Sequence, residues 1–263
     1  MGVVNVTPDS FSDGGLWLDS GRAVAHGIEL AAEGAAILDV GGESTRPGAD
    51  PVSADEELRR VVPVIEGLAE ARTGVQLSID TAKSAVAEAA LAAGARYVND
   101  VTAFRADPEM AELVASAGCD CCLMHMQGEP RTMQADPRYA DVVGEVVSFL
   151  EERAAFAMAA GVARERIQVD PGIGFGKALE HNLELLRRLD EIAALGFPVV
   201  VGVSRKAFLG ALTGRETPAA RVAATVAANV LAFERGGRIF RVHDVAATVD
   251  ALKVATASLR ADG

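Results

Sequence analysis

Eight short apolar runs recur along this chain, and each is followed by a longer segment whose apolar residues have helical spacing. The runs are too short for helices and are apolar on both faces, as strands covered on both sides should be. We predict strands at Gly2–Thr7, Ala36–Gly42, Val75–Asp80, Tyr97–Asp100, Cys121–His125, Ile167–Gly172, Val199–Ser204 and Ile239–Asp244.

The segments between these runs resemble amphipathic helices. One carries Leu179, Leu183 and Leu186 at helical spacing, and the segment after the last run repeats the pattern. Glycines fall where such helices should end, before the next run: Gly34, Gly94, Gly118, Gly161 and Gly196. Eight strand–helix units in 263 residues predict an α/β protein with a (β/α)8 TIM barrel, in one domain spanning residues 1–263. A doubly wound open sheet is the alternative, but the first strand lacks the glycine fingerprint that such sheets use for phosphate.

Charge and composition exclude several classes of protein. The 25 basic and 37 acidic residues give a net charge of −12, which provides no general attraction for nucleic acid or anionic lipid. No apolar run approaches the ~20 residues of a membrane span, and the sequence opens without a secretory signal. Cys119, Cys121 and Cys122 are too close together for a disulfide framework, so we expect buried thiols in a reducing cytoplasm.

Every predicted strand has a polar or ionisable residue at or near its carboxyl end. In a parallel barrel the chemistry lies at these carboxyl ends. Any one of them could simply mark where the chain meets water or caps a helix, as Asp100 and Asp244 could. Eight such ends converging on one mouth favour a site. The residues at these ends are Asn5, Asp39, Asp80, Asn99, Asp100, His125, Asp170, Ser204, Arg205, Lys206, Arg241 and His243.

Two kinds of chemistry meet at this predicted mouth. Asp80, Asn99 and Asp170 suit a planar heterocycle, because a carboxylate can accept two parallel hydrogen bonds from ring and amino N–H groups. A second set concentrates positive charge and suits a phosphate or pyrophosphate. That set is Arg46, Lys206, Arg241 and His243. Together they predict a substrate that carries both groups.

Three loops are expected to approach this substrate. The loops at Thr7–Gly15 and Gly41–Gly48 are polar and rich in glycine, with Phe11 and Pro47 inside them, which is typical of loops that close over a barrel site. The glycine-rich segment Asp170–Lys177 lacks the ending of a P-loop. It could instead allow a flat ligand close to the backbone, with Phe175 stacked beside it.

Several motifs together resemble the dihydropteroate synthase family. They cover nearly the whole chain in the family's order: NVTPDSFSDGG at 5–15, DVGGESTRPG at 39–48, SIDT at 78–81, VND at 98–100, DPGIGFGK at 170–177, SRK at 204–206 and RVHD at 241–244. The resemblance implies that the amine of 4-aminobenzoate displaces pyrophosphate from hydroxymethyl-dihydropterin pyrophosphate and forms dihydropteroate. It also implies a homodimer.

The resemblance further implies roles for individual residues. Asn5 would help to hold Mg²⁺ on the pyrophosphate, which Thr45, Arg46, Arg241 and His243 would bind. Asp80, Asn99, Asp170 and Lys206 would line the pterin pocket, with Met124 and Phe175 as its apolar walls. Phe11 and Pro47 would shape the aminobenzoate pocket. The catalytic residues would be Asp80, Lys206, Arg241 and His243.

We expect a dissociative, SN1-like substitution, because a pterin methylene can ionise early once the leaving group is neutralised. Ala207 departs from the family, since several relatives have a serine there that is thought to touch the aminobenzoate carboxylate. Two alternatives stay open: a pterin-binding methyltransferase of the corrinoid type, and a catalytically inactive pterin-binding relative. The first would not need the pyrophosphate cluster, and the second should have lost loop residues.

Overall fold

The sheet confirms the eight predicted strands and their order. The computed structural model describes residues 1–7, 16–44, 49–129 and 131–260. Its eight strands pair in parallel and in chain order. They are β1 (Gly2–Asn5), β2 (Ile37–Gly41), β3 (Gln76–Asp80), β4 (Tyr97–Asp100), β5 (Asp120–Met124), β6 (Ile167–Asp170), β7 (Val199–Val201) and β8 (Gly237–Phe240).

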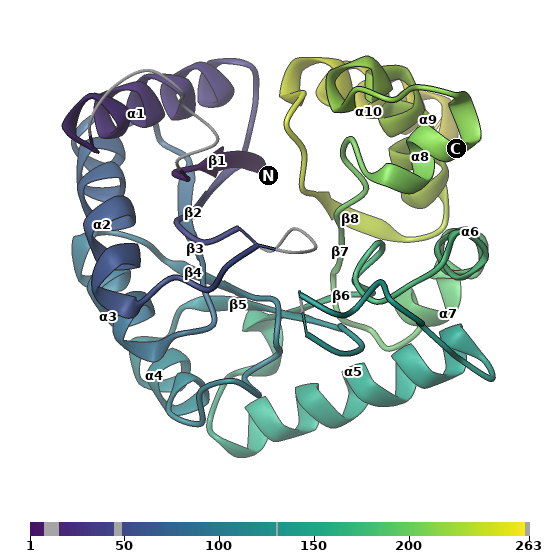
Figure 1. The fold of residues 1–263 in the computed structure, drawn as a ribbon, viewed down its shortest axis with the longest axis horizontal. Helices are drawn as coiled ribbons and strands as arrows, with labels where there is room; N and C mark the ends of the chain where they lie inside the picture. Colours follow the sequence, from purple (N-terminus) through teal and green to yellow (C-terminus); the bar gives the residue numbers. More distant parts are fainter. Residues whose placement is uncertain (8–15, 45–48, 130, 261–263) are drawn as a thin grey trace.

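The sheet curls around a central axis with the helices outside it (Figure 1). Each strand from β1 to β8 pairs with the next, with a register shift at Val199 and Val200 in β7. Between β1 and the chain after β8 the pairing is reduced to one parallel bridge, from Gly2 to Val242, where Val3 N–H donates to the Val242 carbonyl at 3.1 Å. The fold is therefore α/β and TIM-barrel-like, since a doubly wound sheet would reverse its strand order.

The helices follow the strands as predicted. They are α1 (Leu16–Ala32), α2 (Ala54–Glu70), α3 (Ser84–Ala93), α4 (Met110–Ala117), α5 (Val142–Ala159), α6 (Leu179–Arg187), α7 (Leu189–Ala193), α8 (Ala207–Thr213), α9 (Val222–Glu234) and α10 (Val245–Arg260). All five glycines predicted at helix ends have positive φ angles, a conformation that glycine adopts without steric cost. None of the helices described is long and apolar enough to cross a bilayer.

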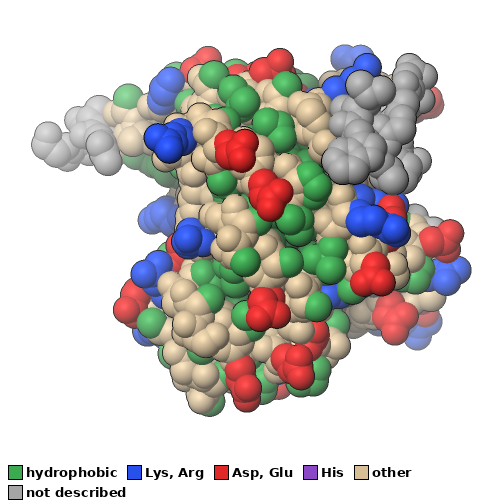
Figure 2. All heavy atoms as spheres, turned by 90° about the vertical axis from the view of Figure 1, so that its left-hand side faces the viewer, with side chains coloured by type: hydrophobic (Ala, Val, Ile, Leu, Met, Phe, Trp, Pro, Cys, Tyr) green, Lys and Arg blue, Asp and Glu red, His purple; other side chains and the backbone are tan. Residues whose placement is uncertain are grey.

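The side of the molecule on the left of Figure 1 is shown in Figure 2. Acidic and basic side chains are scattered on it among apolar and small ones, without a continuous basic surface. Helix α2 is an example of how charged and apolar residues are distributed on one helix. Its Glu66 and Glu70 are exposed, while Val61, Val64 and Ile65 are buried against the sheet. The helix therefore presents one charged face to solvent and one apolar face to the core.

The two faces of the strands differ, which corrects the prediction that both are apolar. The outward side chains, such as Val40 and Ile79, belong to one large core between sheet and helices. Inside the barrel, a small apolar cluster built on Ile37, Tyr97, Cys122 and Val200 is followed toward the mouth by buried polar side chains. The polar layer survives burial because its members bond to one another.

Strand boundaries also differ in detail. The last strand, predicted at Ile239–Asp244, ends at Phe240, so Arg241 and His243 lie in the segment that follows it. The three cysteines are buried and free, as expected for thiols in and beside β5.

Candidate active site

A buried carboxylate organises the centre of the barrel mouth. Asp39, in the middle of β2, has no exposed surface. Its Oδ1 accepts a hydrogen bond from Ser78 Oγ at 2.5 Å, and its Oδ2 accepts one from Asn99 Nδ2 at 3.0 Å and one from Arg241 Nε at 2.6 Å. Three donors thus compensate the buried charge, and Asp39 fixes the orientation of both Asn99 and Arg241.

Arg241 links Asp39 to a second carboxylate. Its Nη2 donates to Asp80 Oδ2 at 2.7 Å, so the guanidinium bridges β2 and β3 from the other edge of the sheet. Burial raises the pKa of Asp80; Arg241 opposes that rise and Asp39 adds to it. Among the residues that the structure describes, none bonds to Arg241 Nη1, which is therefore available to a ligand oxygen.

The opposite side of the mouth joins Asp170, Lys206 and Phe175. Burial raises the pKa of Asp170 and lowers that of Lys206 to about 8. The Lys206 ammonium donates to the Ile173 carbonyl and lies 4.4 Å from the centre of the Phe175 ring. A Cβ added at Gly202 would lie 3.8 Å from Asp170 Oδ2 and 3.9 Å from Lys206 Nζ, so this glycine leaves room for a flat ligand beside both groups.

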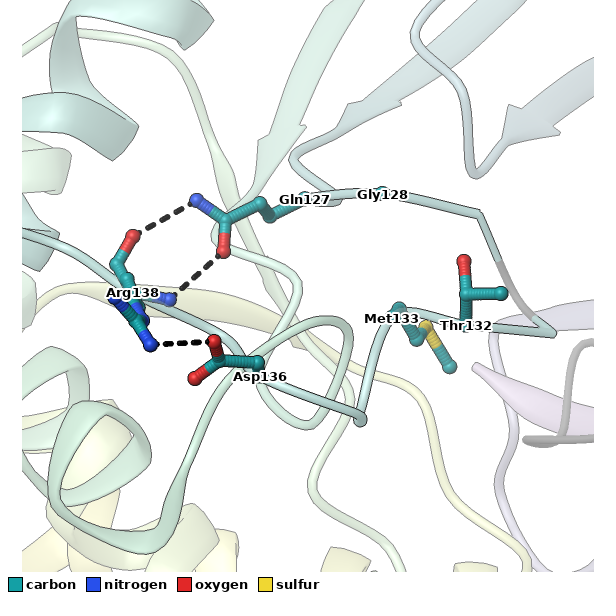
Figure 3. Close-up of a pocket in the computed structure, with 6 residues that line it drawn as sticks. All are labelled: Gln127, Gly128, Thr132, Met133, Asp136 and Arg138. Carbon is teal, nitrogen blue, oxygen red and sulfur yellow. Dashed lines mark hydrogen bonds and ion pairs between the residues drawn. The ribbon is translucent and has the colours of Figure 1, made fainter.

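An apolar wall adjoins this side. Met124, Met126 and Met133 form a buried cluster against which Phe175 packs. Beside it lies a hollow of about 300 Å³, shown in Figure 3. The hollow is lined by Gln127, Gly128, Thr132, Met133, Asp136 and Arg138, and shares only Met133 with the wall. None of the predicted pterin or diphosphate residues lines this hollow.

The segments that carry Lys206 and His243 are tied together. Ser204 Oγ lies 2.9 Å from His243 Nδ1 and accepts a hydrogen bond from His243 N–H at 3.1 Å. Arg205 donates two hydrogen bonds to the Asp244 carboxylate, from Nε at 2.9 Å and from Nη2 at 2.6 Å. The contact between Ser204 and His243 was not predictable from the sequence, because 39 residues separate them.

Among the described residues of the mouth, Asn5 is the candidate ligand for a metal ion. Within the described ranges, no group of three or more His, Cys, Asp or Glu side chains could hold one. Asn5 ends β1 at the rim, beside Gly41 in the sheet register, and its side-chain amide bonds to no other described residue. One amide oxygen suits a Mg²⁺ ion that takes its other ligands from phosphate and water.

The structure brings together most of the predicted site. Asn5, Asp80, Asn99, Met124, Asp170, Phe175, Lys206, Arg241 and His243 all lie at the carboxyl ends of the strands or in the loops that follow them. Phe11, Thr45, Arg46 and Pro47 lie outside the described residues. The prediction listed Asp39 only as a strand end and missed its central role, although a charge inside an apolar run signals a buried partner. Ser78 and Gly202 were also missed.

Comparison with known proteins gives consistent matches. The family model described as pterin binding enzyme matches residues 1–243. A curated dihydropteroate synthase from Neisseria meningitidis serogroup C is 51% identical over 256 residues, covering 96% of this chain and 90% of its own. The dihydropteroate synthase of Xanthomonas albilineans, solved with 4-aminobenzoic acid, superposes with a TM-score of 0.93 at 53% identity, over 99% of this chain and 92% of its own. The same enzyme with 7,8-dihydropteroate gives 0.89 at 49% identity, over 99% and 93%.

Proposed function

The chain belongs to the dihydropteroate synthase family of pterin-binding enzymes, and from that premise we propose how its residues carry out the reaction. The amino nitrogen of 4-aminobenzoate bonds to the methylene carbon of the dihydropterin, the bond from that carbon to the diphosphate oxygen breaks, and the amine loses a proton. The products are dihydropteroate and diphosphate. The observation that carries this proposal is a mouth at which Asp80 and Arg241 lie together on one side and Asp170 and Lys206 on the other.

The pterin ring is recognised by Asp80, Asn99, Asp170 and Lys206. Carboxylate oxygens accept from the ring and amino N–H groups of a pterin, and the Lys206 ammonium donates to its acceptor atoms. Gly202 provides the floor, while Met124 and Phe175 supply apolar surface. The buried position of Asp170, with Oδ1 accepting Gly172 N–H at 2.7 Å, directs the carboxylate before a ligand arrives.

The diphosphate is bound by Arg241 and His243, with Thr45 and Arg46 completing its site. Asp39 and Asp80 hold two nitrogens of Arg241, which aims the third at an incoming oxygen. Asn5 would hold Mg²⁺ there, and the ion would supply additional neutralisation of the leaving group. Phe11 and Pro47 shape the aminobenzoate end of the site.

Charge placement explains the substitution. Arg241 and His243 stabilise the departing diphosphate, and the carboxylates of Asp80 and Asp170 favour positive charge developing on the pterin methylene. An arylamine is already a competent nucleophile, so no strong base is required. These four groups with Lys206 support the SN1-like route.

The test is product formation from the pterin diphosphate and labelled 4-aminobenzoate, with and without Mg²⁺. We expect labelled dihydropteroate that depends on Mg²⁺. Pterin binding without turnover would indicate an inactive relative instead, and cobalamin-dependent methyl transfer would indicate the corrinoid alternative. Scrambling of the bridging and non-bridging diphosphate oxygens without aminobenzoate supports the dissociative route, and bond cleavage only when the amine is present contradicts it.

Lys206 should make pterin binding depend on pH. Because its pKa is about 8 instead of 10.5, we expect affinity for pterin-6-carboxylate to fall about tenfold per pH unit above 8 as the ammonium is lost. Stability moves the other way: the unfolded chain keeps this proton up to pH 10.5, so the contribution of Lys206 to stability rises between pH 8 and 10.5. Titration calorimetry and urea unfolding at each pH measure the two trends.

The control is Lys206→Arg, whose cation does not titrate in this range. Any loss of affinity that this variant shows with rising pH reports titration of the ligand or of protein groups other than residue 206. Equal pH profiles for the native chain and the variant would contradict the role of Lys206.

We propose a homodimer that pairs through α9 and α10. A groove of about 420 Å³ between them is lined by Val230, Glu234, Ala251, Val254, Ala255, Ser258 and Leu259. Two of the lining side chains, Val254 and Leu259, are 72% and 54% exposed, so the groove offers apolar surface to a partner. We expect Val254→Arg to shift the chain from dimer to monomer in light scattering at micromolar concentration. Ile28→Arg, on α1, is the control, and a dimeric Val254→Arg protein would contradict this interface.

Three broader features belong to the same proposal. We propose that the bridge between β1 and Val242 closes a complete (β/α)8 barrel, that residues 1–263 form one domain, and that the protein works in the cytoplasm on small molecules. The family match over residues 1–243 supports the single domain. The free thiols of all three cysteines support a reducing compartment.

A further inference from the structure

The loop between β6 and α6 contains three glycines, yet every carbonyl from 172 to 177 accepts a hydrogen bond. Four of the six donors are side chains from other parts of the chain or from α6. The donors are Phe175 N for Gly172 (3.0 Å), Lys206 Nζ for Ile173, Gln134 Nε2 for Gly174 (2.5 Å), Lys177 Nζ for Phe175 (3.0 Å), Tyr139 OH for Gly176 (2.8 Å) and Asn182 Nδ2 for Lys177 (3.3 Å). The loop is therefore held in one shape.

The glycines let this loop lie directly on the chain after β5. Gly172 and Gly176 have φ angles of +64° and +62°. A Cβ at Gly172 would come within 1.8 Å of the His125 carbonyl oxygen, and one at Gly176 within 2.3 Å of the Gln127 carbonyl oxygen. Two backbones thus touch, and no side chain fits between them.

Lys177 occupies the interior of this contact. Its side chain is buried, with 2% of the residue exposed. Its Nζ lies 2.9 Å from His125 Nδ1, 3.0 Å from the Phe175 carbonyl oxygen and 3.5 Å from the His125 carbonyl oxygen. An ammonium has three N–H donors, so these three acceptors satisfy it. In the part of the chain described, no carboxylate forms an ion pair with Lys177.

His125 is suited to accept this bond. Burial, with Lys177 adding to the effect, lowers the pKa of His125 to about 3, so the ring is neutral and Nδ1 can carry a lone pair. The ring packs edge-on against Phe149, with centroids 4.8 Å apart. Burial also lowers the pKa of Lys177, to about 7. Asp170 opposes that shift through its charge but forms no ion pair with Lys177, so the close contacts of the ammonium are those with His125 and the Phe175 carbonyl.

The contacts lead from Lys177 to the pterin side of the mouth. Lys177 holds the carbonyl of Phe175, whose ring lies under the Lys206 ammonium. The same loop offers the Ile173 carbonyl to that ammonium. Two of the contacts that place Lys206 therefore come from the segment that Lys177 fixes.

The chain after β5 is itself braced where it meets this loop. Figure 3 shows the Gln127 amide facing the main chain of Arg138: Nε2 donates to its carbonyl at 2.9 Å, and Oε1 accepts its N–H at 3.2 Å. These two hydrogen bonds close the segment from Gln127 to Arg138, which supplies Gln134 and leads into Tyr139. The chain against which Lys177 packs is therefore itself held in place.

We propose that Lys177, held against His125, is a positioning residue that sets Phe175 and Lys206 for the pterin ring. The proposal rests on the proposed function, in which these two residues bind that ring. Lys177 does not touch the substrate; it acts through the loop. Its loss should weaken pterin binding more than diphosphate binding, because Arg241 and His243 lie in the segment after β8, where Asp39, Asp80 and Ser204 orient them.

The test compares two ligands on Lys177→Met, which keeps the length of the side chain and removes the amine. The probes are pterin-6-carboxylate and inorganic pyrophosphate with Mg²⁺, titrated calorimetrically well below the melting midpoints of both proteins. We expect affinity for the pterin to fall about tenfold and affinity for pyrophosphate to stay within about twofold of native. Lys177→Gln, which keeps an N–H donor for the Phe175 carbonyl, should recover part of the loss. Lys253→Met, at an exposed lysine on α10, should bind both probes like the native chain.

The ratio of the two affinities separates positioning from folding. Unchanged pterin affinity in Lys177→Met, with a lower melting midpoint, would show that the lysine only stabilises the fold, and equal losses for both probes would also overturn the proposal. If Lys177→Met does not fold, Lys177→Gln and His125→Asn decide by the same ratio. A native chain that binds pyrophosphate but no pterin would refute the proposed function itself, and this inference with it.

Discussion

Replacing Arg241 with methionine should lower kcat/KM for the condensation by about 10³-fold. Arg241 is the cation that we propose for the diphosphate end, and it donates hydrogen bonds of 2.6 and 2.7 Å to Asp39 and Asp80. Preorganised charge of this kind stabilises a leaving group without reorganisation during the reaction. Its removal also leaves two carboxylates facing one another, which repels the diphosphate. Steady-state release of pyrophosphate measures the effect.

Arg241→Lys is the matched control. It keeps the positive charge, but an ammonium cannot span Asp39 and Asp80 as the guanidinium fork does. We expect a loss between those of the native chain and Arg241→Met, together with a smaller change in melting midpoint. A loss below about tenfold in Arg241→Met protein that is fully folded would show that Arg241 serves the carboxylates and not the leaving group.

The fold was predictable because a parallel barrel repeats one simple pattern. Each strand covered by helices requires a short apolar run, and each following helix requires one apolar face, so eight repeats identify eight units. The ends of strands were harder to predict. The run at Ile239–Asp244 extends past the end of β8 at Phe240, because Val242 continues the apolar pattern of the strand into the segment beside the site.

The sequence was enough to predict which residues lie at the mouth, but not which hydrogen bonds join them. The carboxyl ends of parallel strands meet at one end of a barrel, so Asp80, Asp170 and Arg241 could be assigned to one mouth. That Arg241 bridges Asp39 and Asp80 could not be read from the sequence, because 202 and 161 residues separate the partners. Only the closing of the sheet brings β8 beside β1 and lets one guanidinium reach both.

The glycine-rich segment at 170–177 shows a different limit. Its glycines were expected to admit a flat ligand, and they do leave the backbone bare. Yet Gly172 and Gly176 face other main chain, at His125 and Gln127, and a Cβ at Gly174 would meet the side chain of Lys206. The pattern of glycines predicts close approach, but the approaching partner depends on neighbours that are remote in sequence.

Replacing Asp39 with alanine should lower the free energy of unfolding by about 3–5 kcal/mol, the largest stability change expected in this chain. Asp39 is fully buried and accepts from three donors, so its removal leaves Ser78 Oγ, Asn99 Nδ2 and Arg241 Nε without an acceptor. Arg241 Nη2 keeps its hydrogen bond to Asp80. Asp39→Asn keeps the shape and one carbonyl oxygen, and we expect a smaller loss of about 1–3 kcal/mol. Urea unfolding measures both, with the slope checked for a change in the unfolded state.

The double variant Asp39→Ala with Arg241→Met distinguishes an uncompensated charge from a simple cavity. The cost of Asp39→Ala could come mainly from leaving Arg241 Nε without its carboxylate. Removing the arginine as well should then restore part of the free energy of unfolding, so the double variant should lose less than the sum of the two single losses. Losses that simply add would mean that Arg241 finds enough compensation from Asp80 alone. The network around Asp39 would then serve mainly to orient Arg241 for the diphosphate. Its loss would lower kcat/KM more than it lowers the free energy of unfolding.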